Sequence, residues 1–265
     1  MHRRPTAAFA LACALLAVLS ACQSADPHIV VRGHEIRPRT YSLVLWRRND
    51  GAGRLLPMAE TGETAESDAR IEYAERLEDL RDAGILVLAG PFGPAKHDRS
   101  LEGLWVVESG ASFDARALVD ADPAVRWQEK EGEVLPLLTL DILRFLPELG
   151  GMDRTPGVRM QVNGQIMEPR PVLRAYCAVL AEDGERVSRL LDGDVLGPKV
   201  ALMGRLGGER DGTLFAILDV EGPEVARPYL IAASGGRDVP GVELSQVFLT
   251  PALHTLLVEG PPPAQ

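Results

Sequence analysis

The chain has 265 residues, of which 46% are hydrophobic and 5% aromatic, and its 28 lysines and arginines face 38 aspartates and glutamates, a formal net charge of −10. This length and apolar content suit one larger globular domain or two small ones. The acidic balance argues against nucleic acid as a partner, and the few aromatic rings offer little surface on which sugars or bases could stack.

The first residues have the three parts of an export signal. Arg3 and Arg4 give a positive start, residues 7–19 form an apolar segment too short to span a bilayer, and small residues precede Cys22. The stretch from Leu19 to Cys22 resembles the lipobox of bacterial lipoproteins, in which the cysteine receives a diacylglycerol and becomes the mature N-terminus. The alternative is an ordinary cleaved signal with a chance cysteine.

This resemblance implies a bacterial envelope protein held in the lipid bilayer by acylated Cys22. Gln23 follows it, where aspartate would favour inner-membrane retention, so the implied location is the outer membrane, facing the periplasm. Residues 1–21 are then the signal peptide, and residues 22–39, rich in proline and charge, are expected to form an extended tether. Cys177 lies in an apolar, strand-like run, which favours a buried, inert thiol over a nucleophile.

Hydrophobic patterns and turn residues predict six elements in the first half, in the order strand, helix, strand, strand, helix, strand. Gly84 stands where a residue with positive φ ends a helix. The expected ranges are 41–46, 67–84, 85–89, 103–108, 112–120 and 134–140.

The second half repeats this order. Residues 88–90 and 202–204, each ending in glycine, occupy corresponding places. Residues 143–171 between the halves have a linker composition, with a hairpin signal at Asn163-Gly164. The expected ranges of the second half are 173–179, 185–191, 199–204, 213–218, 224–233 and 242–250.

These repeats predict an α+β fold. A four-stranded antiparallel sheet with helices on one face leaves its other face to be covered. A second copy can cover it, so we expect two ferredoxin-like βαββαβ units, residues 40–142 and 172–252, to form an intramolecular pseudo-dimeric α+β barrel, followed by a C-terminal tail at 253–265. Such a fused chain is expected to be a monomer in solution.

The first unit resembles the YCII-related family over four segments, and the resemblance covers about residues 41–142 well and 172–252 in outline. It implies the dimeric α+β-barrel, ferredoxin-like fold, which small members of the family build as homodimers. No cofactor is expected. The segments, which include an Ala-Gly-Pro turn and an Asp-Pro motif, are 73–84, 88–92, 103–108 and 120–124.

The family resemblance also implies an acid/base pair made by a histidine on the first helix and the aspartate of the Asp-Pro motif. Asp122 matches the aspartate, but Tyr73 occupies the histidine position, and tyrosine rarely accepts a proton at neutral pH. The second unit has Val187 and residues 232–233, both alanine, in the corresponding places. The inherited reaction is therefore not expected, and we favour a turn-forming role for Asp122 and packing for Tyr73.

Arg47 and His97 are the candidate ligand-binding residues. Both lie in charged segments that follow strands of the same predicted sheet, so they could meet at one end of it and bind an anion. Two solvated loop tips are the alternative, which charged loops favour. No histidine has a second ligand at metal-binding spacing, so no metal site is expected.

Two functions remain open. The first is a non-catalytic envelope lipoprotein whose barrel binds a small ligand or a partner protein. The second is a periplasmic enzyme of the lyase or hydrolase type, which uses Asp122 and Tyr73 on a small organic substrate. An Asp122 carboxylate in a pocket beside Tyr73 would favour the enzyme. A carboxylate bonded to the backbone of Ala124 or Val125 would favour the binding module.

Overall fold

The computed structural model describes residues 29–49, 75–108, 114–126, 130–150, 160–162, 165–167, 173–191 and 199–263. The expected signal peptide and two of the predicted site residues, Cys22 and Tyr73, lie outside these ranges. Within them, no helix is both long and apolar enough to cross a membrane.

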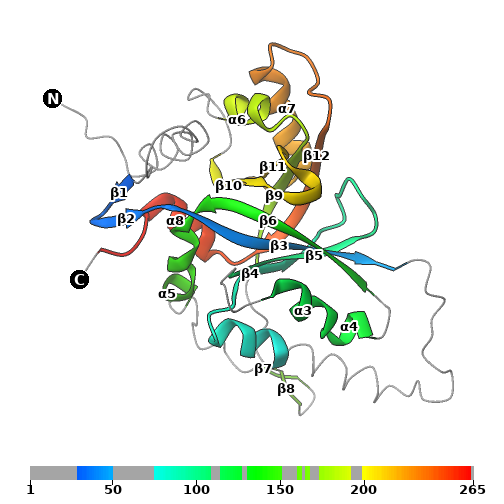
Figure 1. The fold of residues 1–265 in the computed structure, drawn as a ribbon, viewed down its shortest axis with the longest axis vertical. Coiled ribbons are helices and arrows are strands. Elements are labelled where there is room, and N and C mark those ends of the chain that lie inside the picture. Colours follow the sequence, from blue (N-terminus) through cyan, green and yellow to red (C-terminus); the bar gives the residue numbers. More distant parts are fainter. Residues whose placement is uncertain are drawn as a thin grey trace.

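An antiparallel sheet of eight strands is the centre of a mixed α+β fold (Figure 1). Its two edge strands approach each other, so the sheet is nearly closed. All eight strands lie where the hydrophobic patterns predict them. In order along the sheet they are β12 (Val242–Leu249), β9 (Arg174–Ala181), β11 (Leu214–Leu218), β10 (Val200–Leu206), β6 (Lys130–Leu140), β3 (Pro38–Arg48), β5 (Leu101–Glu108) and β4 (Leu86–Pro91).

Each half of the sheet has the same internal order. Numbered along the chain within its own half, the fourth strand lies beside the first, the first beside the third, and the third beside the second. The halves meet at two junctions. At the first, which we call the β6–β10 seam, residues 137–139 pair with residues 204–206. At the second, the β4–β12 seam, Phe92 forms an isolated bridge with Val247.

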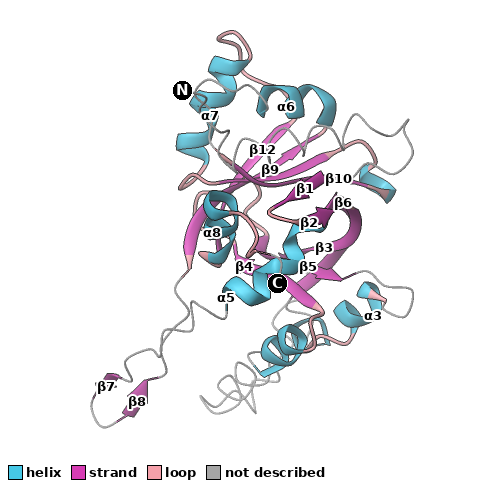
Figure 2. Ribbon diagram, turned by 90° about the vertical axis from the view of Figure 1, so that its left-hand side faces the viewer, coloured by secondary structure: helices cyan, strands magenta, loops and turns pink. Residues whose placement is uncertain are grey.

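Helices cover the outside of the sheet on two sides (Figure 2). Helical residues 75–82, α3 (Ala115–Asp120) and α4 (Pro123–Arg126) lie over the first half, and α6 (Gly184–Leu191) and α7 (Pro223–Ala233) lie over the second. The predicted helix from residue 112 begins later, at Ala115, because the carboxylate of Asp114 accepts the N–H of Arg116 and caps the first turn.

Successive side chains of β3 point alternately to the two faces of the sheet. Leu43 and Leu45 are buried on the inner face of the nearly closed sheet, whereas Val44 and Trp46 are buried under the helices of the first half. The second half supplies its own apolar side chains to the interior, among them Phe215. The inside of the sheet is therefore a shared hydrophobic core of both halves.

One end of the sheet is covered by segments that were expected to form an extended tether and a C-terminal tail. Strands β1 (Ile29–Val31) and β2 (His34–Ile36) form a hairpin, and α8 (Ala252–Glu259) follows the last strand. Val31 and Ile36 are buried. Three-residue strands carry too little pattern to be predicted, and their structure depends on this packing.

The segment between the halves also has structure. It contains a 3₁₀ turn (Asp141–Phe145) and helix α5 (Leu146–Gly150), which packs against α8. Further along, β7 (Met160–Val162) pairs with β8 (Gln165–Met167), so the hairpin predicted from Asn163-Gly164 is confirmed.

Candidate functional site

Asp122 lies in the turn between α3 and α4, and its side chain is 0% exposed. Its Oδ1 accepts a hydrogen bond from the N–H of Ala124 at 2.9 Å, and its backbone carbonyl accepts one from the N–H of Val125 at 3.1 Å. An aspartate that bonds to the backbone two residues ahead forms an Asx turn. The carboxylate of Asp122 therefore acts on its own turn.

Arg76 is the charged neighbour of Asp122 that sequence reasoning missed. Its Nε lies 3.7 Å from Oδ2 of Asp122, and its Nη2 donates to the carbonyl of Leu118 at 3.0 Å. The guanidinium joins the helix of residues 75–82 to α3. An arginine on a helix rich in charge carries no sequence signal of such a role, because its neighbours suggest a solvated face. Tyr73, the residue expected beside Asp122, lies outside the described residues.

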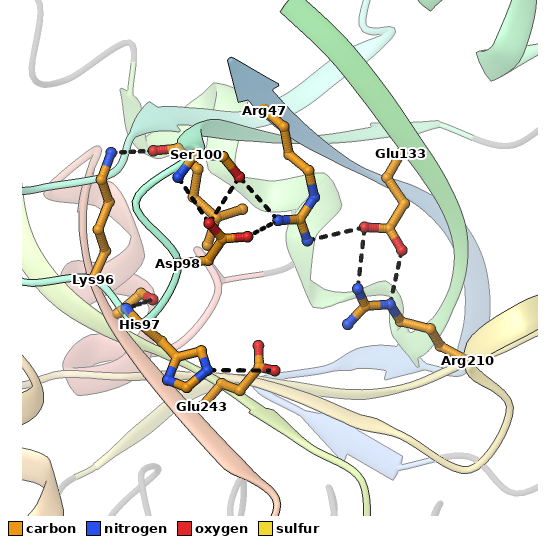
Figure 3. A network of polar contacts seen from close by, with 10 residues as sticks. Arg47, Lys96, His97, Asp98, Ser100, Glu133, Arg210 and Glu243 are labelled. Atoms are coloured by element: carbon orange, nitrogen blue, oxygen red, sulfur yellow. Dashed lines mark hydrogen bonds and ion pairs between the residues drawn. The ribbon is translucent and has the colours of Figure 1, made fainter. Parts of the chain in front are cut away.

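Arg47 belongs to a polar network at the rim of the sheet, at the far end of β3 from the β1–β2 hairpin (Figure 3). We call Arg47, Asp98, Ser100, Glu133 and Arg210 the rim cluster. Arg47 forms an ion pair with Asp98, and its Nη2 lies 3.3 Å from Oε2 of Glu133. The guanidinium of Arg47 thus forms ion pairs with two carboxylates, and an anion would have to displace them to bind Arg47.

The rim cluster spans both halves of the sheet. Arg210, between β10 and β11, donates to the two carboxylate oxygens of Glu133 at 2.8 and 3.2 Å. The backbone N–H of Ser100 donates to Asp98 at 2.8 Å. This hydrogen bond lowers the pKa of Asp98, and the hydroxyl of Ser100 and the charge of Arg47 act in the same direction. Asp98 is therefore held as a carboxylate.

His97 lies beside the rim cluster but contacts the other half of the sheet. Its backbone N–H donates to Oγ of Ser245 at 3.1 Å, and its Nε2 lies 3.8 Å from Glu243. Figure 3 shows this pair apart from Arg47, so the structure brings the two predicted ligand-binding residues to one rim without direct contact. A hollow with room for about one water molecule opens there, lined by Glu243, Ser245 and apolar side chains from both halves.

A second polar cluster, at the opposite end of the sheet, was not predicted. Asp219 follows β11 and is 6% exposed, and its carboxylate lies 2.7 Å from Nδ1 of His254 in the first turn of α8. Arg174 donates to the same carboxylate at 3.0 Å. Residues 174, 219 and 254 are distant in sequence, so no spacing could reveal the cluster. The carboxylate orients the imidazole and fixes α8 to the end of the sheet.

Cys177 is buried on β9, as predicted. Burial raises the pKa of its thiol to about 12, which disfavours the reactive thiolate at neutral pH. Among the residues that the structure describes, no group of three or more histidine, cysteine, aspartate or glutamate side chains could hold a metal ion.

No family model, curated protein or solved structure matches the chain. The resemblance to the YCII-related family therefore stays an expectation from the sequence segments alone.

Proposed function

We propose that this chain is a lipid-anchored protein of the bacterial cell envelope whose two YCII-like units form a non-catalytic module that binds a small ligand or a partner protein. The observation that carries the proposal is the bond from the N–H of Ala124 to the buried carboxylate of Asp122. The residue that would serve as the catalytic acid or base is engaged in its own turn. Its expected histidine partner is replaced by Tyr73.

The proposed architecture is an intramolecular pseudo-dimer of two ferredoxin-like βαββαβ units. The equal strand order of the two halves supports it. So do the corresponding glycines: a Cβ at Gly90 would lie 1.9 Å from the carbonyl oxygen of Phe248, and one at Gly204 would lie 2.7 Å from that of Leu138. The second strand of each half thus lacks a Cβ where it meets the last strand of the other half.

A matching pair of side-chain clusters supports the same repeat. Arg39 pairs with Glu108 at 2.6 Å and lies over the ring of Tyr41. In the second half, Arg174 pairs with Asp219 at 2.9 Å and lies over the ring of Tyr176. Each arginine and tyrosine stand two residues apart on the first strand of their half. The same arrangement at equivalent places is what a duplicated unit would retain.

Substitution of Asp122 tests the non-catalytic role. Asp122→Asn removes the charge beside Arg76, and we expect it to lower the free energy of unfolding by about 1–3 kcal/mol, because a buried charged partner is lost. Asp120→Asn on the exposed end of α3 is the matched control and is expected to leave stability unchanged. An Asp122→Asn variant with wild-type stability that loses turnover on small organic substrates would favour the enzyme instead.

The anchor is tested separately. Wild-type protein from the membrane fraction is expected to carry a diacylglyceryl mass on Cys22, and Cys22→Ser is expected to remain unacylated and unprocessed. Intact mass measurement of both proteins decides this. A wild-type protein processed without acyl chains would contradict the lipoprotein assignment and leave the barrel proposal standing.

A further inference from the structure

The tether is shorter than the residues 22–39 expected from the sequence. Residues 29–36 form the β1–β2 hairpin, whose Val31 and Ile36 are buried against the body of the protein. Only residues 23–28 then separate Cys22 from the folded part. Six residues span at most about 20 Å when fully extended. Resting on the proposed acylation of Cys22, this length keeps the hairpin close to the bilayer.

The end of the molecule that bears the hairpin has surface features that fit a lipid surface. Val30 is 67% exposed on β1, and Val258 is 43% exposed in the last turn of α8. Arg32 stands at the exposed turn of the hairpin and contacts the carbonyl of Pro261 just after α8, so the two elements lie together. Exposed apolar side chains suit the interfacial region of a bilayer, and Arg32 and Glu35 on the same hairpin give the surface both signs of charge.

The rim cluster lies at the other end of the same strand. Strand β3 begins at Pro38, next to the hairpin, and ends at Arg48, next to Arg47. Eleven residues at about 3.3 Å each place these ends roughly 33 Å apart, and Figure 1 shows β3 running from the side of the hairpin and the C-terminal end to the opposite side. If the rim cluster rested on the bilayer, the hairpin would stand about the length of β3 away from it. The tether of residues 23–28 is shorter than that length, so it could not reach.

We propose that the β1–β2 hairpin and the end of α8 form a surface that rests on the lipid bilayer, and that the rim cluster points away from it into the aqueous phase. The polar side chains of the rim, among them Arg47, His97 and Glu243, are then presented to soluble ligands or partners. The orientation follows from the hairpin, the tether length and the direction of β3.

The test uses the full acylated chain in vesicles of phosphatidylethanolamine and phosphatidylglycerol that contain a lipid-borne fluorescence quencher. Single labels are placed at Val30→Cys and, as the matched control, at Arg99→Cys in the rim loop, since both positions are exposed. Cys177 is buried and will not take the label. We expect loss of fluorescence at position 30 and none at position 99, and a long glycine-serine insertion after Ser24 is expected to abolish the loss.

Several outcomes would overturn this orientation. Equal quenching at both positions, or quenching at position 99 alone, would do so while the acyl mass on Cys22 kept the proposed anchor intact. Protection of position 30 from a water-soluble quencher without quenching by lipid would mean that a protein covers the hairpin. Absence of the acyl mass would remove both the anchor and the orientation, so the two failures are distinguishable.

Discussion

The two seams join the same halves of the sheet, yet they are built differently. At the β6–β10 seam, three successive residue pairs form a ladder, and Glu133 and Arg210, which are 28% and 29% exposed, bind across it through two hydrogen bonds. At the β4–β12 seam, one bridge is flanked by two backbone hydrogen bonds, and His97 and Glu243 face each other at 3.8 Å with 54% and 41% of their side chains exposed.

This difference teaches that two halves with the same strand order need not be joined by equal junctions. Exposed ion pairs contribute little because solvent screens them, whereas a partly buried arginine with a two-point contact to a carboxylate is held more firmly. The β4–β12 seam therefore depends on close backbone packing at Gly90 and on few hydrogen bonds. We expect local opening of the sheet to begin there.

The largest expected effect comes from Gly90→Ala. The new Cβ would meet the carbonyl oxygen of Phe248 at 1.9 Å, and backbone atoms cannot move aside without separating β4 from β12. We expect a loss of about 3 kcal/mol in the free energy of unfolding, as overpacking of this severity costs. Chemical denaturation measures the loss, and hydrogen exchange should show faster exchange of the amides of Gly93 and Gln246.

Two other glycines provide the comparison for that variant. Gly204→Ala, at the β6–β10 seam, meets a flexible methyl of Leu137 and the carbonyl of Leu138 at 2.7 Å, so we expect a smaller loss of about 1–2 kcal/mol. Gly207→Ala has its nearest contact at 3.5 Å and should be neutral. If Gly204→Ala lowered the free energy of unfolding more than Gly90→Ala, the β4–β12 seam would not be the one that depends more on close backbone packing.

The next effect is expected from Glu133→Gln. The substitution keeps the shape of the side chain but removes the charge that Arg210 and Arg47 share. We expect the unfolding free energy to fall by about 1–2 kcal/mol, since charge-assisted hydrogen bonds are replaced by neutral ones. Glu131→Gln, exposed on the same strand, is the control and should be unchanged. Equal stability of both variants would show that the rim cluster does not hold the β6–β10 seam.

Acid should weaken the rim cluster by a smaller amount. The pKa of Asp98 is lowered in the folded protein, so its contribution to stability is present above the unfolded pKa near 4 and is lost as the pH falls through the lowered folded value. Denaturation midpoints measured from neutral pH down to about pH 3 should fall less steeply in Asp98→Asn than in wild type. If the denaturation midpoints of the two proteins fell equally with pH, Asp98 would not be a source of the loss of stability in acid.

The smallest effect is expected from His97→Gln. The pair with Glu243 is exposed on both sides, so its removal should change the unfolding free energy by less than about 0.5 kcal/mol. Thermal and chemical denaturation of the variant would check this. A loss as large as that of Glu133→Gln would mean that the two seams depend equally on their side-chain pairs.

Sequence patterns were most reliable where secondary structure is local. The run that became β3 alternates between the inside of the sheet and the helices, and that alternation is visible in the residues themselves. Helix α8 was missed although Leu253, Leu256 and Leu257 have helical spacing and Gly260 ends the helix with φ 78°. A helical signal was therefore present in the expected tail.

The candidate site was predictable in part. The Asp-Pro motif alone indicated that Asp122 opens a turn, and the bond to Ala124 agrees with it. The approach of Arg76 to that carboxylate brings together residues 46 positions apart, and the contact of Glu133 with Arg210 brings together residues 77 positions apart. Such contacts depend on how the helices and strands pack, which no local pattern encodes.

By itself, the sequence determined the chain order of the eight strands of the main sheet, the repetition of that order and the corresponding glycines at residues 90 and 204, because these depend on residue type and short-range spacing. Only the tertiary structure decided that residues 29–36 join the body, that the two seams differ, and that Asp122 is buried. The physical reason is that burial and strand pairing across long sequence separations are set by the hydrophobic core that both halves share.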